Sequence, residues 1–275
     1  MWLLIAVMVQ PYLLRVIVGI LYLQADRYQA QADLPSAINL LEYAKPVAPN
    51  RAQPHNKLGF IHILRGDELA GRYEFEDALA ADLTFGPALN NLGVLQYGDH
   101  QGQDALLYLA RAVESAPDNA QVRYNLGVTL RAQGDVLEAE RAYKEASRIK
   151  PDWILPHLEL SQLYLAREDW ELAIRAANQM LELDPQSYPA HLVYIYAQYA
   201  QKNFVESRAA AEKALAIFPN DATLKFYEAL SMHDLGQSTA ALNLLQTTYL
   251  LTDQPQLRAR IANEMRAIVG RYKYH

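Results

Sequence analysis

Apolar and small residues recur along most of the chain with a period of 34 residues. The dipeptide Leu92-Gly93 returns as Leu126-Gly127, and proline recurs at the same interval at positions 117, 151, 185 and 219. Extending this frame gives seven consecutive windows without insertion or deletion: 18–51, 52–85, 86–119, 120–153, 154–187, 188–221 and 222–255. A fixed period of this length indicates a solenoid of stacked structural repeats.

Small residues occupy two fixed positions within these windows. The eighth position holds Ala25, Gly59, Gly93, Gly127, Ser161 and Ala229, with Ile195 as the exception, and the twentieth holds Ala37, Gly71, Ala105, Ala139, Ala173, Ser207 and Ala241. The pattern predicts two helices of roughly 12 to 14 residues in each window, which approach closely where both residues are small. Gln133-Gly134-Asp135 exemplifies the turn between them, and the closing proline ends the second helix. We therefore expect Gly127 to face Ala139.

This frame resembles the tetratricopeptide repeat (TPR) family over residues 18–255. Two windows carry the resemblance most clearly: 86–119, with NNLGVLQ, Ala105, Ala112 and Pro117, and 120–153, with YNLGVTL, Ala139, Tyr143, Ala146 and Pro151. Three windows depart from the family pattern, at Leu83, at Tyr194-Ile195 and at Glu228-Ala229. The resemblance implies an all-α fold, a right-handed α-solenoid of about seven helix pairs. It also implies a concave groove, lined by the first helices, that holds peptides or partner proteins.

The first 23 residues are almost entirely apolar. Thirteen of them are Leu, Ile or Val, and Arg15 is the only charged side chain. Because the first repeat begins near Val18, we assign residues 1–17 to a separate N-terminal hydrophobic helix and favour a single-pass membrane anchor. Arg27 follows the run, which favours a cytoplasmic solenoid. A helix buried in protein and a retained signal peptide are the alternatives.

Two polar residues interrupt this apolar run. Arg15 either extends along its aliphatic stem to the membrane interface or meets a partner's polar group within the membrane. Gln10 lies five residues before it. We predict that Gln10 or Arg15 contacts a partner subunit, because lipid gives helices little hydrophobic drive to associate.

The tail, residues 256–275, is basic and amphipathic. It carries Arg258, Arg260, Arg266, Arg271 and Lys273, and its apolar residues Leu257, Ile261, Met265 and Ile268 follow helical spacing. We expect a C-terminal capping helix with a short tail. A basic contact with acidic lipid or with a partner is the alternative.

Composition and motifs argue against catalysis. The 275 residues include no cysteine, which excludes disulfides, thiolate metal sites and thiol nucleophiles, and the net charge of −6 argues against nucleic-acid binding. No phosphate loop, nucleophile elbow, zinc-protease motif or EF-hand loop is present. His55, His157 and His191 share the fourth repeat position and are interpreted as packing residues, and Glu74, Glu76 and Asp77 as solvated charges. We therefore expect no enzyme activity, metal or cofactor.

The best candidate site is the groove that the resemblance implies. In the family, four positions of the first helix tend to face it, and here they hold Asn56, Lys57, Phe60, Asn90, Asn91, Tyr97, Tyr124, Asn125, Arg131, Tyr196, Tyr199, Phe226 and Tyr227. Spaced Asn amides can bind an extended peptide backbone, and Tyr and Phe supply the contact area typical of protein-binding surfaces. The alternative for these Asn and aromatic residues is a structural role within the solenoid.

These features predict a non-catalytic, membrane-anchored TPR scaffold. It would be a subunit or assembly factor of a larger membrane complex, with integral membrane proteins and the bilayer as partners. The alternative is a peptide-binding receptor or co-chaperone that uses the groove transiently.

Overall fold

The structure is a computed structural model that describes residues 2–48, 50–99 and 101–272, with side chains described between Tyr12 and Gly270. These residues form fifteen α-helices and no strand. The chain divides into two compact units, Met1–Ile149 and Lys150–His275.

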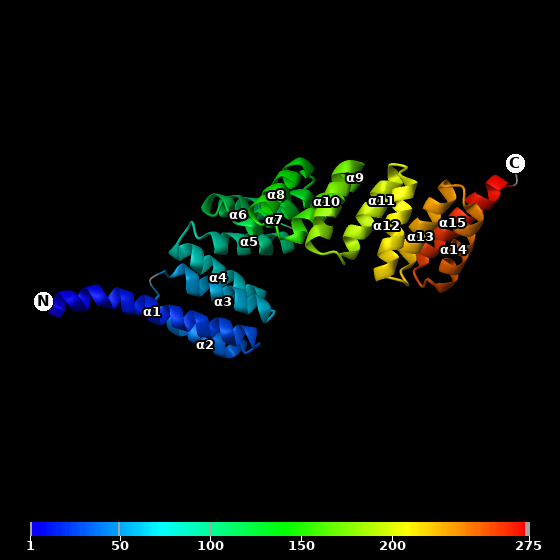
Figure 1. The fold of residues 1–275 in the computed structure, drawn as a ribbon. Coiled ribbons are helices and arrows are strands. Elements are labelled where there is room, and N and C mark those ends of the chain that lie inside the picture. The colour runs from blue at the N-terminus through cyan, green and yellow to red at the C-terminus, as the bar shows by residue number, and fades with distance from the viewer. Residues whose placement is uncertain (1, 49, 100, 273–275) are drawn as a thin grey trace. The chain divides into compact units, whose positions relative to one another are not determined.

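The first unit holds four helix pairs, each formed by helices adjacent in sequence (Figure 1). The helices are α1 (Trp2–Ala30), α2 (Leu34–Ala44), α3 (Ala52–Leu64), α4 (Glu68–Ala81), α5 (Gly86–Gly98), α6 (Gly102–Ser115), α7 (Ala120–Ala132) and α8 (Val136–Ile149). Among the first helices, α3 also contacts α5, and α5 contacts α7. Each pair leaves an apolar face that only the next pair can cover, which explains the stacking.

The second unit continues the same pattern and ends on an additional helix. Its helices are α9 (Ile154–Ala166), α10 (Trp170–Leu183), α11 (Tyr188–Ala200), α12 (Phe204–Ile217), α13 (Ala222–Asp234), α14 (Ser238–Leu251) and α15 (Pro255–Tyr272). Leu257, Ile261 and Ile268 of α15 are buried in the cluster formed by α11 to α14. The amphipathic tail helix thus covers the last pair.

The turn between paired helices depends on one residue with a left-handed backbone. Gly66, Gly134 and Gly236 have φ between +80° and +87° at this point, and Ala32, Glu168 and Lys202 have φ between +60° and +64°. All six occupy the fifteenth position of their windows. Glycine adopts this conformation at no steric cost, whereas the other three carry a Cβ that opposes it.

The close approach of paired helices differs in detail from the sequence expectation. A Cβ built on Gly127 would lie 2.7 Å from the ring of Tyr143, and Ala139 is not among its nearest contacts. At Gly59 the nearest group is likewise a ring, that of Phe75, at 2.6 Å. A large side chain one turn beyond the small twentieth residue fills the space that glycine leaves.

The N-terminal expectation requires a correction. Within the described residues, no helix is both long enough and apolar enough to span a bilayer. α1 is one 29-residue helix, whose later part packs as a repeat helix, with Val18 and Ala25 buried, and carries Asp26 and Arg27. The separate hydrophobic helix over 1–17 is not supported. The single-pass anchor is therefore wrong, and the cytoplasmic placement deduced from it is withdrawn.

Candidate functional site

A row of amide side chains crosses the first helices α3, α5 and α7. Asn91 Nδ2 donates a hydrogen bond to Asn56 Oδ1 at 3.0 Å, and Asn125 Nδ2 donates to Asn90 Oδ1 at 2.8 Å. A longer bond of 3.4 Å from Asn90 Nδ2 to Asn91 Oδ1 joins the two pairs, and Gln121 Nε2 extends the row by donating to Asn125 Oδ1 at 2.9 Å. We call these five residues the amide row.

The amide row is partly accessible and can make further bonds. Each amide has two N–H donors and an oxygen with two lone pairs, and the four bonds above use only part of this capacity. Asn56, Asn90, Asn91 and Asn125 are half-buried, whereas Gln121 is exposed. The sequence frame pointed to the four Asn residues but missed Gln121, which lies one helical turn before Asn125.

Lys57 and Phe60 lie beside the row on α3. Lys57 Nζ lies 2.5 Å from Asp26 Oδ1 and 5.7 Å from the centre of the Tyr22 ring, so it ties α3 to α1. Burial raises the pKa of Tyr22 to about 12. Phe60 is exposed and remains available for contact, as does Tyr97 on α5.

Two further predicted residues lie on α7. The ring of Tyr124 is half-buried and packs on Tyr143 with centroids 5.7 Å apart, so it supports the α7–α8 pair. Arg131 is half-buried near the end of α7. A partner-binding role for Tyr124 and Arg131 stays a prediction.

Aromatic side chains gather on α10 to α13 of the second unit. Tyr196 meets the edge of Trp170 at a centroid distance of 5.8 Å and Tyr227 at 5.9 Å. Tyr199 packs on Phe204 at 5.4 Å, and its hydroxyl donates to Asp234 at 2.7 Å. Burial first, and then this bond, raise the pKa of Tyr199. Neither Trp170 nor Phe204 was a candidate from sequence.

Phe226 and Tyr227 do not fit the predicted contact surface. Phe226 is 1% exposed and Tyr227 is 8% exposed, so neither ring offers area to a partner. The guanidinium of Arg260 on α15 lies 5.0 Å from the centre of the Phe226 ring. Covering by the terminal helix removes Phe226 from the candidate set, and Tyr196 and Tyr199 remain.

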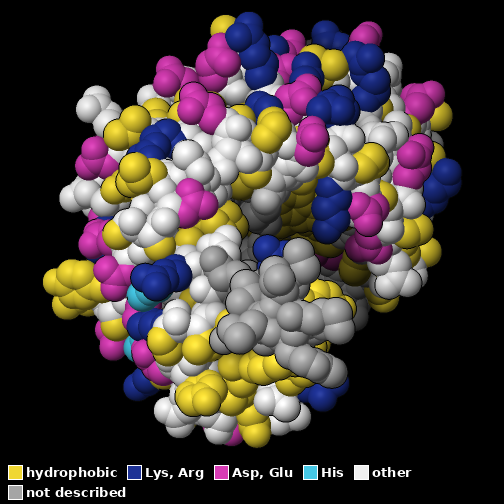
Figure 2. Space-filling view, turned by 90° about the vertical axis from the view of Figure 1, so that its left-hand side faces the viewer, with side chains coloured by type: hydrophobic (Ala, Val, Ile, Leu, Met, Phe, Trp, Pro, Cys, Tyr) yellow, Lys and Arg dark blue, Asp and Glu magenta, His cyan; other side chains and the backbone are white. Residues whose placement is uncertain are grey.

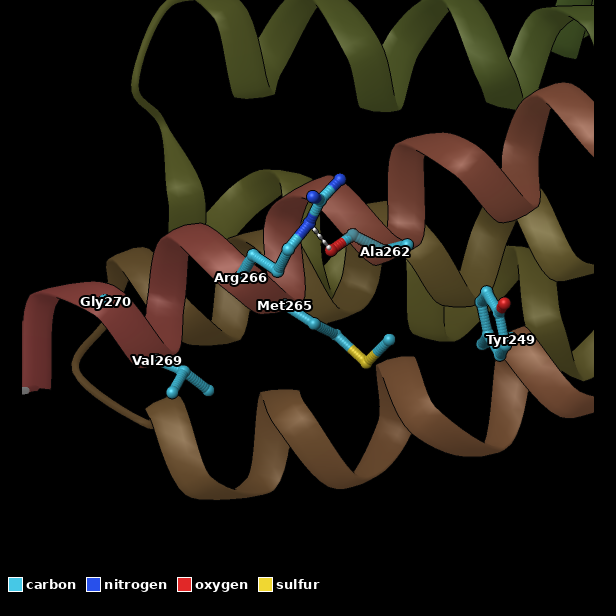
Figure 3. Close-up of a pocket in the computed structure, with 6 residues that line it drawn as sticks. All are labelled: Tyr249, Ala262, Met265, Arg266, Val269 and Gly270. Atoms are coloured by element: carbon cyan, nitrogen blue, oxygen red, sulfur yellow. Dashed lines mark hydrogen bonds between the residues drawn. The ribbon is translucent and has the colours of Figure 1, made fainter.

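An apolar pocket lies between α14 and α15, with a volume of about 550 Å³. Its lining residues are Tyr249, Ala262, Met265, Arg266, Val269 and Gly270. Figure 3 shows the Met265 side chain extending from α15 toward α14, and the Arg266 guanidinium bonded back to the Ala262 carbonyl. The helical spacing predicted that Met265 lies on the packing face of the tail helix, but it did not predict an open pocket there.

Three side chains on α3 and α4 approach one another closely enough to hold a metal ion. The candidate ligand atoms of His55, Glu74 and Asp77 lie within 4.8 Å of one another. However, Glu74 also accepts a hydrogen bond from Lys45 Nζ at 2.8 Å. The positive charge of this lysine would repel a metal cation bound at the same carboxylate. Burial alone lowers the pKa of Lys45, but the bonds to Glu74 and Glu42 outweigh it and raise the pKa. Glu74 is thus ion-paired and not simply solvated.

The two polar residues of the apolar run remain without a described partner contact. Arg15 is exposed on α1, and the side chain of Gln10 lies outside the described residues. The predicted contact of either with a partner subunit stays a prediction. Neither lipid contact nor an integral membrane partner is shown for the described residues.

Comparison with known proteins supports the repeat interpretation. A family model described as tetratricopeptide repeat matches residues 90–152 and 158–222. Among proteins with curated functions, none matches this sequence.

Several solved structures share the fold at low sequence identity. Pseudomonas aeruginosa PilF has a TM-score of 0.65 at 17% identity, covering 78% of this chain and 97% of its own. YrrB, described as a TPR protein with an unusual peptide-binding site, has a TM-score of 0.60 at 15% identity, covering 69% and 97%. Yeast Tom70 has a TM-score of 0.52 at 15% identity, covering 96% of this chain and 56% of its own.

These identities establish likeness of fold alone. TPR proteins bind other proteins, and their repeat fold is generally non-catalytic. The two matched segments thus resemble the tetratricopeptide repeat family, and the solved structures share the fold.

Proposed function

We propose that this chain is a non-catalytic scaffold, a stable subunit or assembly factor of a larger protein complex. The observation that carries the proposal is the apolar pocket between α14 and α15. Apolar pockets on the surface mark sites of association, and stable complexes use more apolar interfaces than transient ones do.

The surroundings of the pocket define the chemistry of the partner. Arg258 stacks over Tyr249 at 5.6 Å, and Arg266 lines the pocket itself. An apolar side chain inserted between α14 and α15, flanked by carboxylates that meet these guanidinium groups, satisfies both features. The expected partner segment is therefore amphipathic and acidic.

A stringent co-purification experiment tests this proposal. Val269 is 45% exposed at the pocket, so Val269→Asp places a charge there without entering the core. Leu250→Asp is the matched control, because Leu250 is 70% exposed on α14 and does not line the pocket. Near-stoichiometric partners should survive washing with the native chain and Leu250→Asp, and should be lost with Val269→Asp. Partners that wash away from the native chain would contradict a stable scaffold.

The amide row favours a second candidate, a receptor that binds extended peptides transiently. Amides spaced along three helices can bond a peptide backbone without selecting its side chains. This candidate predicts that the isolated chain binds short peptides in fluorescence polarisation. The Asn91→Ala/Asn125→Ala variant should bind at least about tenfold more weakly if two such bonds are lost. Gln103→Ala on the exposed face of α6 should leave binding unchanged.

A further inference from the structure

Helix α1 is apolar on two opposite faces. One face packs into the first repeat, where Val18 is 3% exposed and Ala25 is 1% exposed. The other face carries a line of exposed residues, Leu13, Val16, Ile20 and Leu23, which are 43% to 64% exposed. We call these four residues the outer stripe. Figure 2 faces the side on which α1 begins, and hydrophobic side chains gather on this face of the molecule beside the undescribed ones.

The outer stripe has the spacing of a coiled-coil seam. Its residues are separated by three, four and three positions, which is the a/d pattern of a heptad repeat. In the same register Val18 and Ala25 take the f position, diametrically opposite the seam. The spacing continues upstream in the sequence through Val9, Ala6 and Trp2, so that three heptads fall within α1.

We propose that the outer stripe pairs with the outer stripe of a second copy of this chain, in antiparallel orientation. A helix that is apolar all round is normally covered all round, and in the described structure α1 packs mainly on α2. The stripe is self-complementary, because positions 2, 6, 9, 13, 16, 20, 23 and 27 are symmetrical about the point between Leu14 and Arg15. An isologous two-fold contact requires this symmetry.

The charges of α1 select the orientation. Arg27 takes the next seam position after Leu23, so a parallel in-register pair would place two Arg27 side chains opposite each other. The antiparallel arrangement instead pairs position 27 with position 2, which carries no charge. It also pairs Leu13 with Val16, which leaves the centre of the seam apolar. Arg15, the remaining cation of the helix, lies off the seam in this register.

The mass of the full chain in solution tests the pairing. Light scattering coupled to gel filtration should give about twice the chain mass of 31.1 kDa. The double variant Val16→Glu/Ile20→Glu should weaken the dimer by roughly 100-fold or more, because it buries unpaired carboxylates in the seam. Both residues are exposed in the single chain, so circular dichroism should show an unchanged fold. Arg15→Glu, on the same helix but off the seam, should remain dimeric.

A distance measurement tests the orientation. The chain has no cysteine, so Gln24→Cys, exposed beside the seam, takes a single spin label. In the antiparallel register the two labels lie about 28 Å apart along the helix axis, for 19 residues at ~1.5 Å each, whereas a parallel pair brings them side by side. Three results would overturn the proposal: a native chain that is monomeric, a dimer that survives Val16→Glu/Ile20→Glu, or a monomer whose stripe binds phosphatidylcholine vesicles.

Discussion

One window of the second unit, 188–221, fills the space inside its helix pair in the opposite way from the windows of the first unit. In three windows of the first unit the eighth position of the repeat is glycine and the twenty-fourth is large: Gly59 with Phe75, Gly93 with Leu109 and Gly127 with Tyr143. In the second unit the twenty-fourth position is alanine in two windows, in which Ser161 and Ile195 hold the eighth position and Ala177 and Ala211 the twenty-fourth. In the window of Ile195 and Ala211, the large side chain therefore comes from the first helix and not from the second.

Both arrangements leave the space between the paired helices filled. A Cβ on Gly93 would lie 2.6 Å from Leu109 Cγ, so the first unit has no room for a larger residue there. In the second unit Ile195 and Ala211 are both fully buried in one cluster. The last pair, Ala229 with Leu245, returns to the first arrangement. One small and one large residue thus share these two positions in every window except 154–187, where Ser161 and Ala177 are both small.

The largest single effect is expected where the first helix supplies the volume. Ile195→Ala should destabilise the chain by about 3 kcal/mol, because Ala211 opposite is too small to fill the cavity. Urea unfolding of the native chain and the variant measures this difference. A loss of stability below about 1 kcal/mol would mean that neighbouring side chains move in to fill the cavity, and it would contradict the role of Ile195.

A somewhat smaller effect is expected where glycine leaves the space. Gly127→Leu should destabilise the chain by about 2 kcal/mol, because the leucine side chain would overlap the Tyr143 ring. Even a Cβ at this position would lie only 2.7 Å from that ring. Gly98→Leu is the matched control, because a Cβ there meets nothing within 4 Å. The same unfolding experiment applies. Equal unfolding midpoints in urea for the two variants would contradict the packing role of Gly127.

The inter-helix turn offers a change in the stabilising direction. Gly66 and Gly134 supply the left-handed residue in two turns of the first unit, but Glu168 and Lys202 do so in the second. Lys202→Gly should stabilise the chain by about 0.5 kcal/mol, since φ of +64° opposes a Cβ. Gly134→Ala, the reverse exchange in the first unit, should destabilise it. Thermal unfolding of both variants checks the signs, and a destabilising Lys202→Gly would contradict the argument.

The smallest effect concerns the histidine at the fourth position. His55 in the first unit bonds Glu74 at 2.7 Å, whereas burial lowers the pKa of His157 in the second unit below its usual 6.5, opposed by a backbone bond at Pro151. The folded chain then binds fewer protons than the unfolded chain between the two pKa values. The stabilisation is therefore present above pH 6.5 and is lost as the pH falls through the lowered value. The His157→Gln variant should show a smaller fall in melting temperature over this range, and an identical fall would contradict the role of His157.

The repeat frame predicts where helices begin and end but not how their side chains meet. The turn expected at Gln133-Gly134-Asp135 lies between α7 and α8, because a 34-residue period allows few other positions for it. The contact of Gly127 with Tyr143 was not predicted, since helical side chains lean toward the N-terminus and shift the contact by a turn. The bounds 18–255 for the repeats and 256–275 for the tail stay a prediction, whereas the separate helix over 1–17 is not supported.

The candidate site was predicted only in part. Asn56, Asn90, Asn91 and Asn125 form one hydrogen-bonded row because the sixth position of each first helix bonds the fifth position of the first helix before it. The burial of Phe226 was not predictable from the repeat, since it depends on α15, which lies outside the period. The outer stripe of α1 was visible in the sequence as apolar spacing, but the structure was needed to show which of its faces is buried.

The most direct test of the volume exchange is a double-mutant cycle at Gly127 and Tyr143. Gly127→Ile and Tyr143→Ala are each expected to destabilise the chain, by overpacking and by cavity formation, but together they reproduce the Ile195 and Ala211 arrangement of the second unit. The double variant should be at least about 2 kcal/mol more stable in urea unfolding than the sum of the single losses predicts. Additive losses, with a coupling energy near zero, would contradict the claim that the two positions share one space.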